Sequence, residues 1–170
     1  MKENIMRKIK LERVVLNVGG TEEKLEKGTI LLNRLTGKKP SKVKATKRIP
    51  TWGVRPGLEV GVKVTLRRKE AEEFLKRVLE GINNTLKAKQ FQTNFVSFGI
   101  KEYIEIPSME YIREVGIMGF EVSVVFTRAG KRIVLKKVKR GKPKRQQIDA
   151  EEIMDYFENN FQTKITGRKK

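Results

Sequence analysis

The sequence predicts an α+β fold: a mostly antiparallel sheet with helices packed on one face, an open face, and a projecting basic hairpin. Two observations support this prediction. Strand-like and helix-like segments are interleaved, and some neighbouring strands are joined as hairpins, which are antiparallel. Three helix-like segments, at about 22–36, 69–87 and 149–161, each carry one apolar stripe that has to be buried against the sheet.

The first predicted strand covers residues 11–18, and its period-two alternation places Asn17 on the face opposite an apolar set. Thr21 is positioned to cap a following helix over 22–36, and Gly37 fits the C-terminal stop of that helix. The apolar set of the strand consists of Val14, Leu16 and Val18.

The segment 37–68 is the most distinctive stretch, because it holds many basic residues and a single acid, Glu59. We expect two strands, at 41–46 and 58–67, joined by a loop that projects from the domain. Val43 is expected on the core face of the shorter strand. The longer strand alternates between an apolar face (Leu58, Val60, Val62, Val64, Leu66) and a polar face that includes Lys63, Thr65 and Arg67.

The rest of the chain predicts further elements in order. Residues 69–87 have the clearest helical pattern, 87–99 are expected as loop, 100–106 as a strand and 108–114 as a short helix. A hairpin is expected from a strand at 120–127 and a returning strand at 131–139, followed by an irregular basic loop at 140–147.

The last predicted helix, 149–161, begins with a capping box formed by Asp149 and Glu152. Ile148 and Ile153 occupy the positions of a hydrophobic staple. No linker divides the 170 residues, so we expect a single domain over 1–170, with the hairpin at 42–67 and a basic segment at 136–147.

Composition narrows the function. The net charge is +19, from 39 basic and 20 acidic residues, which predicts a polyanionic partner. The chain has no cysteine and no histidine, which removes disulfides, a thiol nucleophile and the usual base near neutral pH. We therefore expect no enzyme, no metal and no cofactor. Neither a signal peptide nor a membrane span is expected, which predicts a cytoplasmic protein.

Several short patterns have simpler explanations than a functional motif. The phosphate-loop pattern fails around Lys38, because a glycine is missing five residues before Gly37. The glycine pair before Thr21 can cradle a phosphate or merely form a turn. Gly119-Phe120 matches the aromatic strand of an RNA-recognition motif poorly. Trp52 is either anchored in a local cluster or free to stack on a base.

The polar face of the 58–67 strand is a stronger signal than these patterns. Lys63, Thr65 and Arg67 are spaced about 6.5–7 Å apart along a strand, close to the phosphate spacing of one nucleic-acid strand. Such side chains bind phosphate and ribose. The alternative is a solvated face that keeps the protein soluble.

Four stretches then identify a family: VVLNVGG, TGKKPSKVKATKRIPTWGVRPGLEVGVKVTLRR, SFGIKEYIEIP and GIMGFEVSVVF. In order and spacing they resemble the large-subunit ribosomal protein five family, whose members carry 5S ribosomal RNA. The basic segment before the last helix is similar to the archaeal and eukaryotic branch. The family usually has Gln, Phe and an acid where this chain has Lys38, Trp52 and Pro56.

The resemblance implies a structural constituent of the large ribosomal subunit that attaches 5S ribosomal RNA (rRNA) to the central protuberance. Its hairpin loop would contact the transfer RNA (tRNA) of the P site. Further implied partners are large-subunit rRNA, neighbouring proteins of the central protuberance and a protein of the small-subunit head. The implied 5S rRNA-binding residues are Asn17, Lys38, Lys39, Lys63, Thr65 and Arg67. Those of the tRNA loop are Lys44, Thr46, Lys47, Arg48, Trp52 and Arg55, and further rRNA contacts are Lys136, Lys137, Lys139, Arg140, Lys142, Lys144 and Arg145.

Two other functions stay open from the residues alone. A free-standing DNA-compacting or RNA-chaperone protein would share the charge but needs no projecting hairpin of this sequence. An enzyme would need paired carboxylates or an activated lysine, and no acids cluster in an apolar context.

Overall fold

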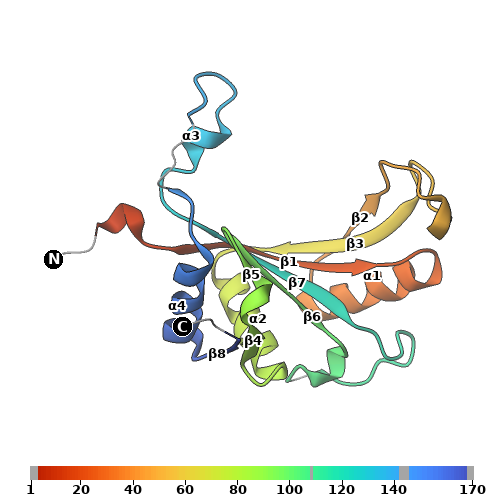
Figure 1. Ribbon diagram of the computed structural model, residues 1–170. Helices are drawn as coiled ribbons and strands as arrows, with labels where there is room; N and C mark the ends of the chain where they lie inside the picture. Colours follow the sequence, from red (N-terminus) through yellow and green to blue (C-terminus); the bar gives the residue numbers. More distant parts are fainter. Residues whose placement is uncertain (1–3, 108, 142–145, 168–170) are drawn as a thin grey trace. The chain divides into compact units, whose positions relative to one another are not determined.

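The computed structural model describes residues 4–107, 109–141 and 146–167. It confirms an α+β fold with a mostly antiparallel sheet (Figure 1). The six-stranded sheet has the order β2 (Ser41–Lys44), β3 (Glu59–Leu66), β1 (Lys10–Gly19), β7 (Phe120–Thr127), β6 (Phe95–Ile100) and β5 (Phe91–Gln92). A second sheet pairs β4 (Thr85–Lys87) with β8 (Lys164–Thr166). The α-helices are α1 (Glu23–Thr36), α2 (Arg68–Gly81), α3 (Arg132–Leu135) and α4 (Ala150–Phe161), with 3-10 turns at Ile5–Arg7, Pro50–Trp52, Ala88–Gln90 and Tyr103–Glu105.

The chain forms two compact units. The hairpin unit comprises Val15–Leu66 and Phe98–Ser123. The terminal unit comprises the chain up to Val14, the stretch Arg67–Ser97, and the chain from Val124 onward. That all 170 residues form one domain stays a prediction.

In the hairpin unit, α1 packs against β3 and comes unusually close to β1. A Cβ added at Gly28 would lie 2.8 Å from Val18 Cγ1, so only glycine lets the helix approach this closely. This glycine, unfavourable by helix propensity, is therefore explained by packing. The helix buries Leu25, Leu31, Leu32 and Leu35.

The ends of α1 differ in part from prediction. Gly37 ends the helix as expected, in the left-handed conformation with φ 65°, and its amide donates to the Asn33 carbonyl. The N-cap is Glu22, one residue later than the predicted Thr21, and its side chain makes no capping hydrogen bond. The carbonyl of Thr21 instead accepts from the Lys24 amide, which closes a turn before the helix begins.

In the terminal unit, aromatic side chains hold α4 in place. The ring of Phe157 lies edge-on to Phe91 and to Phe126, with centroids 5.5 and 5.7 Å away. The inner stripes of both helices are fully or almost fully buried: Phe74, Leu75, Val78 and Leu79 in α2, and Ile153, Met154 and Phe157 in α4.

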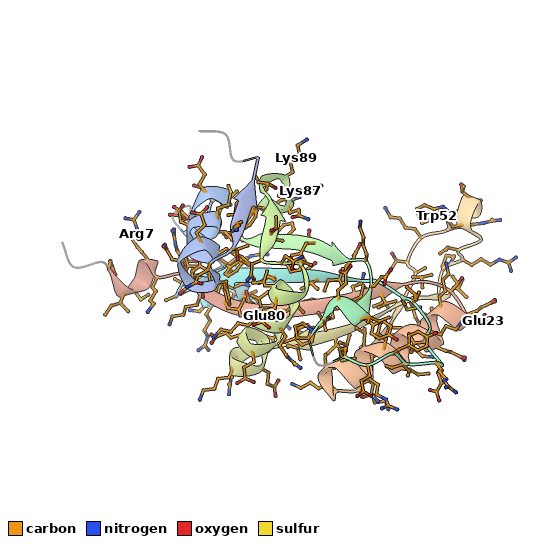
Figure 2. All side chains as sticks on the ribbon, turned by 90° about the horizontal axis from the view of Figure 1, so that it is seen from below. Arg7, Glu23, Trp52, Glu80, Lys87 and Lys89 are labelled. Carbon is orange, nitrogen blue, oxygen red and sulfur yellow. The ribbon has the colours of Figure 1, made fainter. Side chains whose placement is uncertain are left out.

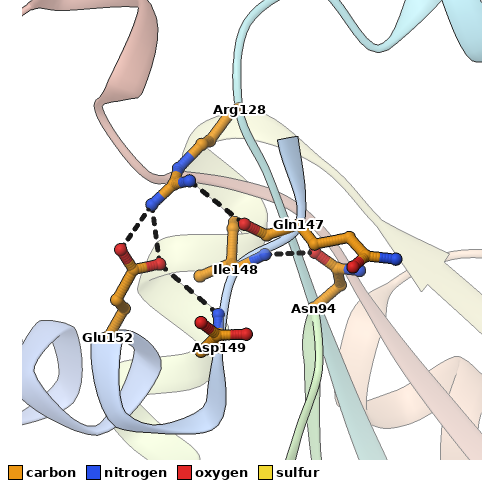
Figure 3. Close-up of polar contacts among 6 residues, drawn as sticks. All are labelled: Asn94, Arg128, Gln147, Ile148, Asp149 and Glu152. Carbon is orange, nitrogen blue, oxygen red and sulfur yellow. Dashed lines mark hydrogen bonds and ion pairs between the residues drawn. The ribbon is translucent and has the colours of Figure 1, made fainter. Parts of the chain in front are cut away.

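The start of α4 is fixed by a polar network around a buried arginine (Figure 3). The Arg128 side chain is 8% exposed, and its Nη2 donates to both carboxylate oxygens of Glu152 at 2.7 and 2.6 Å. Its Nη1 donates to the Gln147 carbonyl at 3.0 Å. The capping box of Asp149 and Glu152 is present, so that prediction is confirmed. Ile148 and Ile153 are both fully buried, as a hydrophobic staple requires.

The predicted helix over 69–87 is too long, because α2 ends at Gly81. Asn83 and Asn84 follow with φ of 54° and 50°, a left-handed conformation that asparagine tolerates and that turns the chain. Leu86, expected on the helix stripe, is instead buried in β4, which pairs in parallel with β8.

The strand predicted at 100–106 lies earlier, as β6 at Phe95–Ile100. It forms a short hairpin with β5, where a loop was expected, through a turn at Asn94 with φ 68°. Tyr103–Glu105 is a 3-10 turn. The short helix expected at 108–114 is absent from residues 109–114, and position 108 lies outside the described residues.

The returning strand predicted at 131–139 is wrong. Residues Arg132–Leu135 form the short helix α3 instead. The preceding strand β7 already has a neighbour on each side, β1 and β6, so no free edge is left for a third strand beside it. The segment therefore satisfies its backbone locally, with amides of Ile133 and Val134 donating to carbonyls of Gly130 and Lys131.

We predict that Glu152→Ala lowers the free energy of unfolding by about 2 kcal/mol, because it leaves the buried Arg128 guanidinium without its carboxylate. The matched control is Glu151→Ala, an exposed acid of the same first turn, which should cost only about 0.5 kcal/mol through the helix dipole. Urea unfolding measures both values. Equal losses would show that the buried pair adds nothing beyond the dipole.

A second prediction concerns alkaline pH. Burial raises the pKa of the Tyr156 phenol above 10.0, and the nearby Glu72 carboxylate raises this pKa further. The unfolded chain then releases the phenolic proton more readily than the folded protein, so stability falls as the pH rises through about 10. Tyr156→Phe removes this contribution and should flatten the loss of stability measured by urea unfolding between about pH 9 and 11. The control is Tyr111→Phe, whose ring is 57% exposed; identical profiles for all three proteins would contradict the prediction.

Candidate nucleic-acid interface

The polar face predicted on β3 is present. Val62, Val64 and Leu66 are at most 4% exposed, whereas Lys63 and Thr65 between them are exposed. Burial of the apolar residues fixes the strand's rotation, and the side chains of Lys63 and Thr65 therefore point away from the core.

The alternation stops at a bulge near Val60. Ser41 pairs with Lys63 and Val43 with Gly61, but Lys44 pairs with Glu59, which leaves Val60 as an extra residue in β3. Glu59 is thereby turned toward the other side of the hairpin, where its Oε2 accepts from Lys42 Nζ at 2.7 Å.

Two predictions for the hairpin are wrong as a result. Val43 shares a face with Lys63 rather than with the core, since it stands opposite Gly61, and its Cβ would be 4.0 Å from a Cβ added there. Leu58, expected on the apolar face, is 40% exposed because it precedes the bulge and lies outside the strand.

Asn17 lies on the same face as Lys63. Its Oδ1 would be 3.8 Å from a Cβ at Gly61, and its Nδ2 donates to Glu121 Oε2 at a long 3.4 Å. The absence of a side chain at Gly61 leaves Asn17 uncovered from that direction. Sequence reasoning missed Ser41, Val43 and Glu121 on this face, because strand register and the pairing of β1 with β7 decide their positions.

The remaining residues of the predicted 5S rRNA set are exposed but lie at the edges. Lys38 and Lys39 follow the left-handed Gly37, immediately before β2. Arg67 belongs to the terminal unit, where it is the extended N-cap residue of α2. We define the open face as Asn17, Lys63 and Thr65 around Gly61, all in the hairpin unit.

The hairpin loop extends beyond β2 and β3 and is internally braced (Figure 1). Ile49 and Val54 exchange both backbone hydrogen bonds, at 2.9 and 3.1 Å, and Val54 is 8% exposed. Trp52 ends the short turn Pro50–Trp52 and is 75% exposed, so it is not anchored in a cluster (Figure 2). The other predicted loop residues are all exposed: Lys44, Thr46, Lys47, Arg48 and Arg55.

The basic segment lies in the terminal unit. Lys136, Lys137, Lys139 and Arg140 are exposed, and the Gly141 amide donates to the Ile133 carbonyl at 3.3 Å, which folds the segment back on itself. Lys142, Lys144 and Arg145 lie outside the described residues.

Chemically, the open face and the loop offer cations, amides and a hydroxyl around a side-chain-free centre at Gly61. The glycine pair near Thr21 offers less to a phosphate, because the Gly20 amide already donates to the Val60 carbonyl at 3.1 Å. Among residues 4–107, 109–141 and 146–167 no three His, Cys, Asp or Glu side chains group as a metal site. None of the helices in this part of the chain is long and apolar enough to span a membrane.

Comparison with known proteins places these features in a family context. The family model described as "Ribosomal protein L5" matches residues 4–55, and a second model, for the C-terminus of the same ribosomal family, matches residues 59–161. The chain is 43% identical to large ribosomal subunit protein uL5 of Nanoarchaeum equitans, over 96% of this chain and 99% of that protein. It is 42% identical to uL5 of Sulfolobus acidocaldarius (96% and 94%) and 36% identical to uL5 of Methanosphaera stadtmanae (95% and 99%).

Proposed function

Because this chain belongs to the ribosomal protein L5 family, we propose that it binds 5S rRNA on the open face and contacts P-site tRNA through its hairpin loop. The family consists of structural proteins of the large ribosomal subunit. The observation that best supports the 5S rRNA site is the exposure of Lys63 and Thr65 beside the buried Val62, Val64 and Leu66.

The open face suits folded RNA rather than a free anion. Lys63 supplies a flexible cation for phosphate, while Thr65 and Asn17 supply a hydroxyl and an amide for ribose or base edges. Gly61 between them lets an RNA backbone approach the sheet closely. Lys38, Lys39 and Arg67 extend the same chemistry along the chain on either side.

The loop suits a second RNA. Its exposed cations Lys47, Arg48 and Arg55 bind phosphate without regard to sequence, and Trp52 offers a ring for stacking. Since the Ile49–Val54 bridge braces the loop, it can reach a partner without first being ordered. By its family membership we assign P-site tRNA as that partner.

The basic segment is proposed to contact large-subunit rRNA, from Lys136 to Arg145. No acid occurs between Glu121 and Asp149, so phosphate meets no local repulsion there. Neighbouring proteins of the central protuberance and of the small-subunit head complete the proposed set of partners. Sequencing the RNA that copurifies with the protein tests the assignment, because one RNA species is expected and mixed nucleic acid would favour a DNA-compacting or RNA-chaperone protein.

We predict that Thr65→Val weakens 5S rRNA binding by about 1–2 kcal/mol, because the RNA group paired with the hydroxyl loses its partner. Valine keeps the side-chain shape and suits a strand, so thermal unfolding should hardly change. Thr93→Val, at an exposed position in the terminal unit, is the matched control and should leave affinity unchanged. Unchanged affinity for Thr65→Val would remove Thr65 from the proposed interface.

We also predict that the two RNA contacts can be separated. Replacing residues 48–56 by a short Gly/Ser turn should keep 5S rRNA affinity within about threefold, because changing the loop length alters closure entropy little. The same change should weaken tRNA retention on assembled ribosomes. Changing Lys63 and Arg67 to Ala should lower 5S rRNA affinity itself.

The measurements are 5S rRNA affinity of the purified proteins and tRNA binding to ribosomes that carry each variant. If the loop replacement abolishes 5S rRNA binding as fully as the Lys63 and Arg67 variant does, the hairpin acts as one binding surface and the two-partner proposal is wrong.

A further inference from the structure

A groove of about 900 Å³ opens in the hairpin unit between the start of α1 and the hairpin loop. One wall is formed by the end of β1 and the first residues of α1, from Gly19 to Lys24. The other wall is formed by the loop, including Ile49, Trp52 and Val54, and Val60 also lines the groove.

Both walls are held in place by backbone hydrogen bonds. The Gly20 amide donates to the Val60 carbonyl at 3.1 Å, which ties the first wall to β3. A Cβ at Gly20 would stand 2.7 Å from Lys24 Cβ, so a side chain is not tolerated at this corner. The Ile49–Val54 bridge braces the second wall. The groove is therefore preformed, which lowers the entropic cost of binding.

The loop wall exposes apolar surface to water. Trp52 is 75% exposed and Ile49 is 38% exposed, beside the nearly buried Val54. Exposed aromatic and aliphatic side chains that line a concave surface are typical of a site for an apolar group.

The opposite wall carries negative charge. Glu22 and Glu23 are exposed, and neither forms an ion pair within the described part of the chain. Glu22 also has φ 47° and ψ −114°, a conformation unfavourable for a residue with a side chain, and it makes no capping hydrogen bond in return. Strain without local compensation is frequently found at binding sites.

We propose that this groove binds an extended segment of a basic protein in which aliphatic and cationic side chains alternate. An aliphatic side chain would lie against Ile49 and Val60, and a lysine or arginine would lie beside Glu22 and Glu23. Lys24 and Lys47 also line the groove, so its charge is mixed and the apolar contact is needed as well as the cation. This surface is additional to the open face and to the cationic loop residues proposed for RNA.

An RNA strand fits the groove less well. The carboxylates of Glu22 and Glu23 repel phosphate, and the Gly20 amide that would otherwise serve an anion is already bonded to Val60. The protein as a whole carries a charge of +19, so a basic ligand can be attracted only where acids are locally concentrated.

Trp52 provides the measurement, because it is the only tryptophan of the chain and forms part of the groove. The full-length protein is titrated with a seven-residue peptide of alternating lysine and leucine, which has no tryptophan. We expect saturable binding with a blue shift of the Trp52 emission. Matched peptides of alternating lysine and serine, and of alternating glutamate and leucine, should each bind at least about fivefold more weakly.

The matched protein variants are Glu22→Gln with Glu23→Gln, and Glu102→Gln with Glu105→Gln, an equally exposed pair of acids outside the groove. The first pair should weaken the lysine–leucine peptide at least about fivefold, and the second pair should not. Circular dichroism melting confirms that each variant is folded. Equal affinities of both variants for the peptide, or no saturable binding to the wild type, would overturn the proposal.

A uridine decanucleotide separates the groove from the RNA-binding surfaces. If the oligonucleotide displaces the peptide and binds more tightly to the Glu22 and Glu23 variant, the groove belongs to the RNA interface and the proposal is wrong. If the peptide still binds when the protein is saturated with 5S rRNA, the groove is a separate site, and this result holds or fails independently of which RNA the open face binds.

Discussion

The close packing of α1 on β1 and β3 is the constraint on which the hairpin unit depends. Gly28 lets the helix contact Val18 directly, and the same layer buries Val62 and Val64. Once these side chains are fixed toward the helix, every intervening residue of the strand faces outward, because a shift by one residue would exchange the two faces. The core therefore specifies the direction of Lys63 without contacting its charged end.

The bulge at Val60 marks where this constraint ends. Beyond it Glu59 pairs with Lys42, Leu58 becomes partly exposed, and the chain leaves the sheet for the loop. A bulge increases twist and redirects the strands, so the loop is aimed independently of the core. The short bridge between Ile49 and Val54 then replaces core packing as the source of order in the loop.

Charge is distributed unevenly over the hairpin unit. Cations dominate the loop and the open face, whereas the first turn of α1 holds Glu22, Glu23 and Glu26. These acids stabilise the helix through its dipole, but two of them also border the groove. A strongly basic protein can therefore offer surfaces for both an anionic and a cationic partner, provided that its few acids are grouped.

Local signals in the sequence predicted several features correctly because their physics is local. The capping box of Asp149 and Glu152 and the left-handed stop at Gly37 depend on neighbours within four residues. The alternation from Gly61 to Leu66 was reliable because one face is buried. A turn at Asn94 and the alternation of Val96, Phe98 and Ile100 were also present as signals for β6, although the apolar residues that follow shifted the prediction toward 100–106.

By itself the sequence determined the fold class, the family, the polyanionic character of the expected partner and the outward direction of Lys63 and Thr65, since periodicity and composition encode them. Only the tertiary structure decided that 131–139 is not a strand, that Val43 faces outward, and that α1 and the loop enclose a groove. Each of these depends on which segment occupies a neighbouring position: the filled edges of β7, the register of β2 on β3, and the bond from Gly20 to Val60. Such pairings join residues that are distant in the chain, and a local pattern carries no information about them.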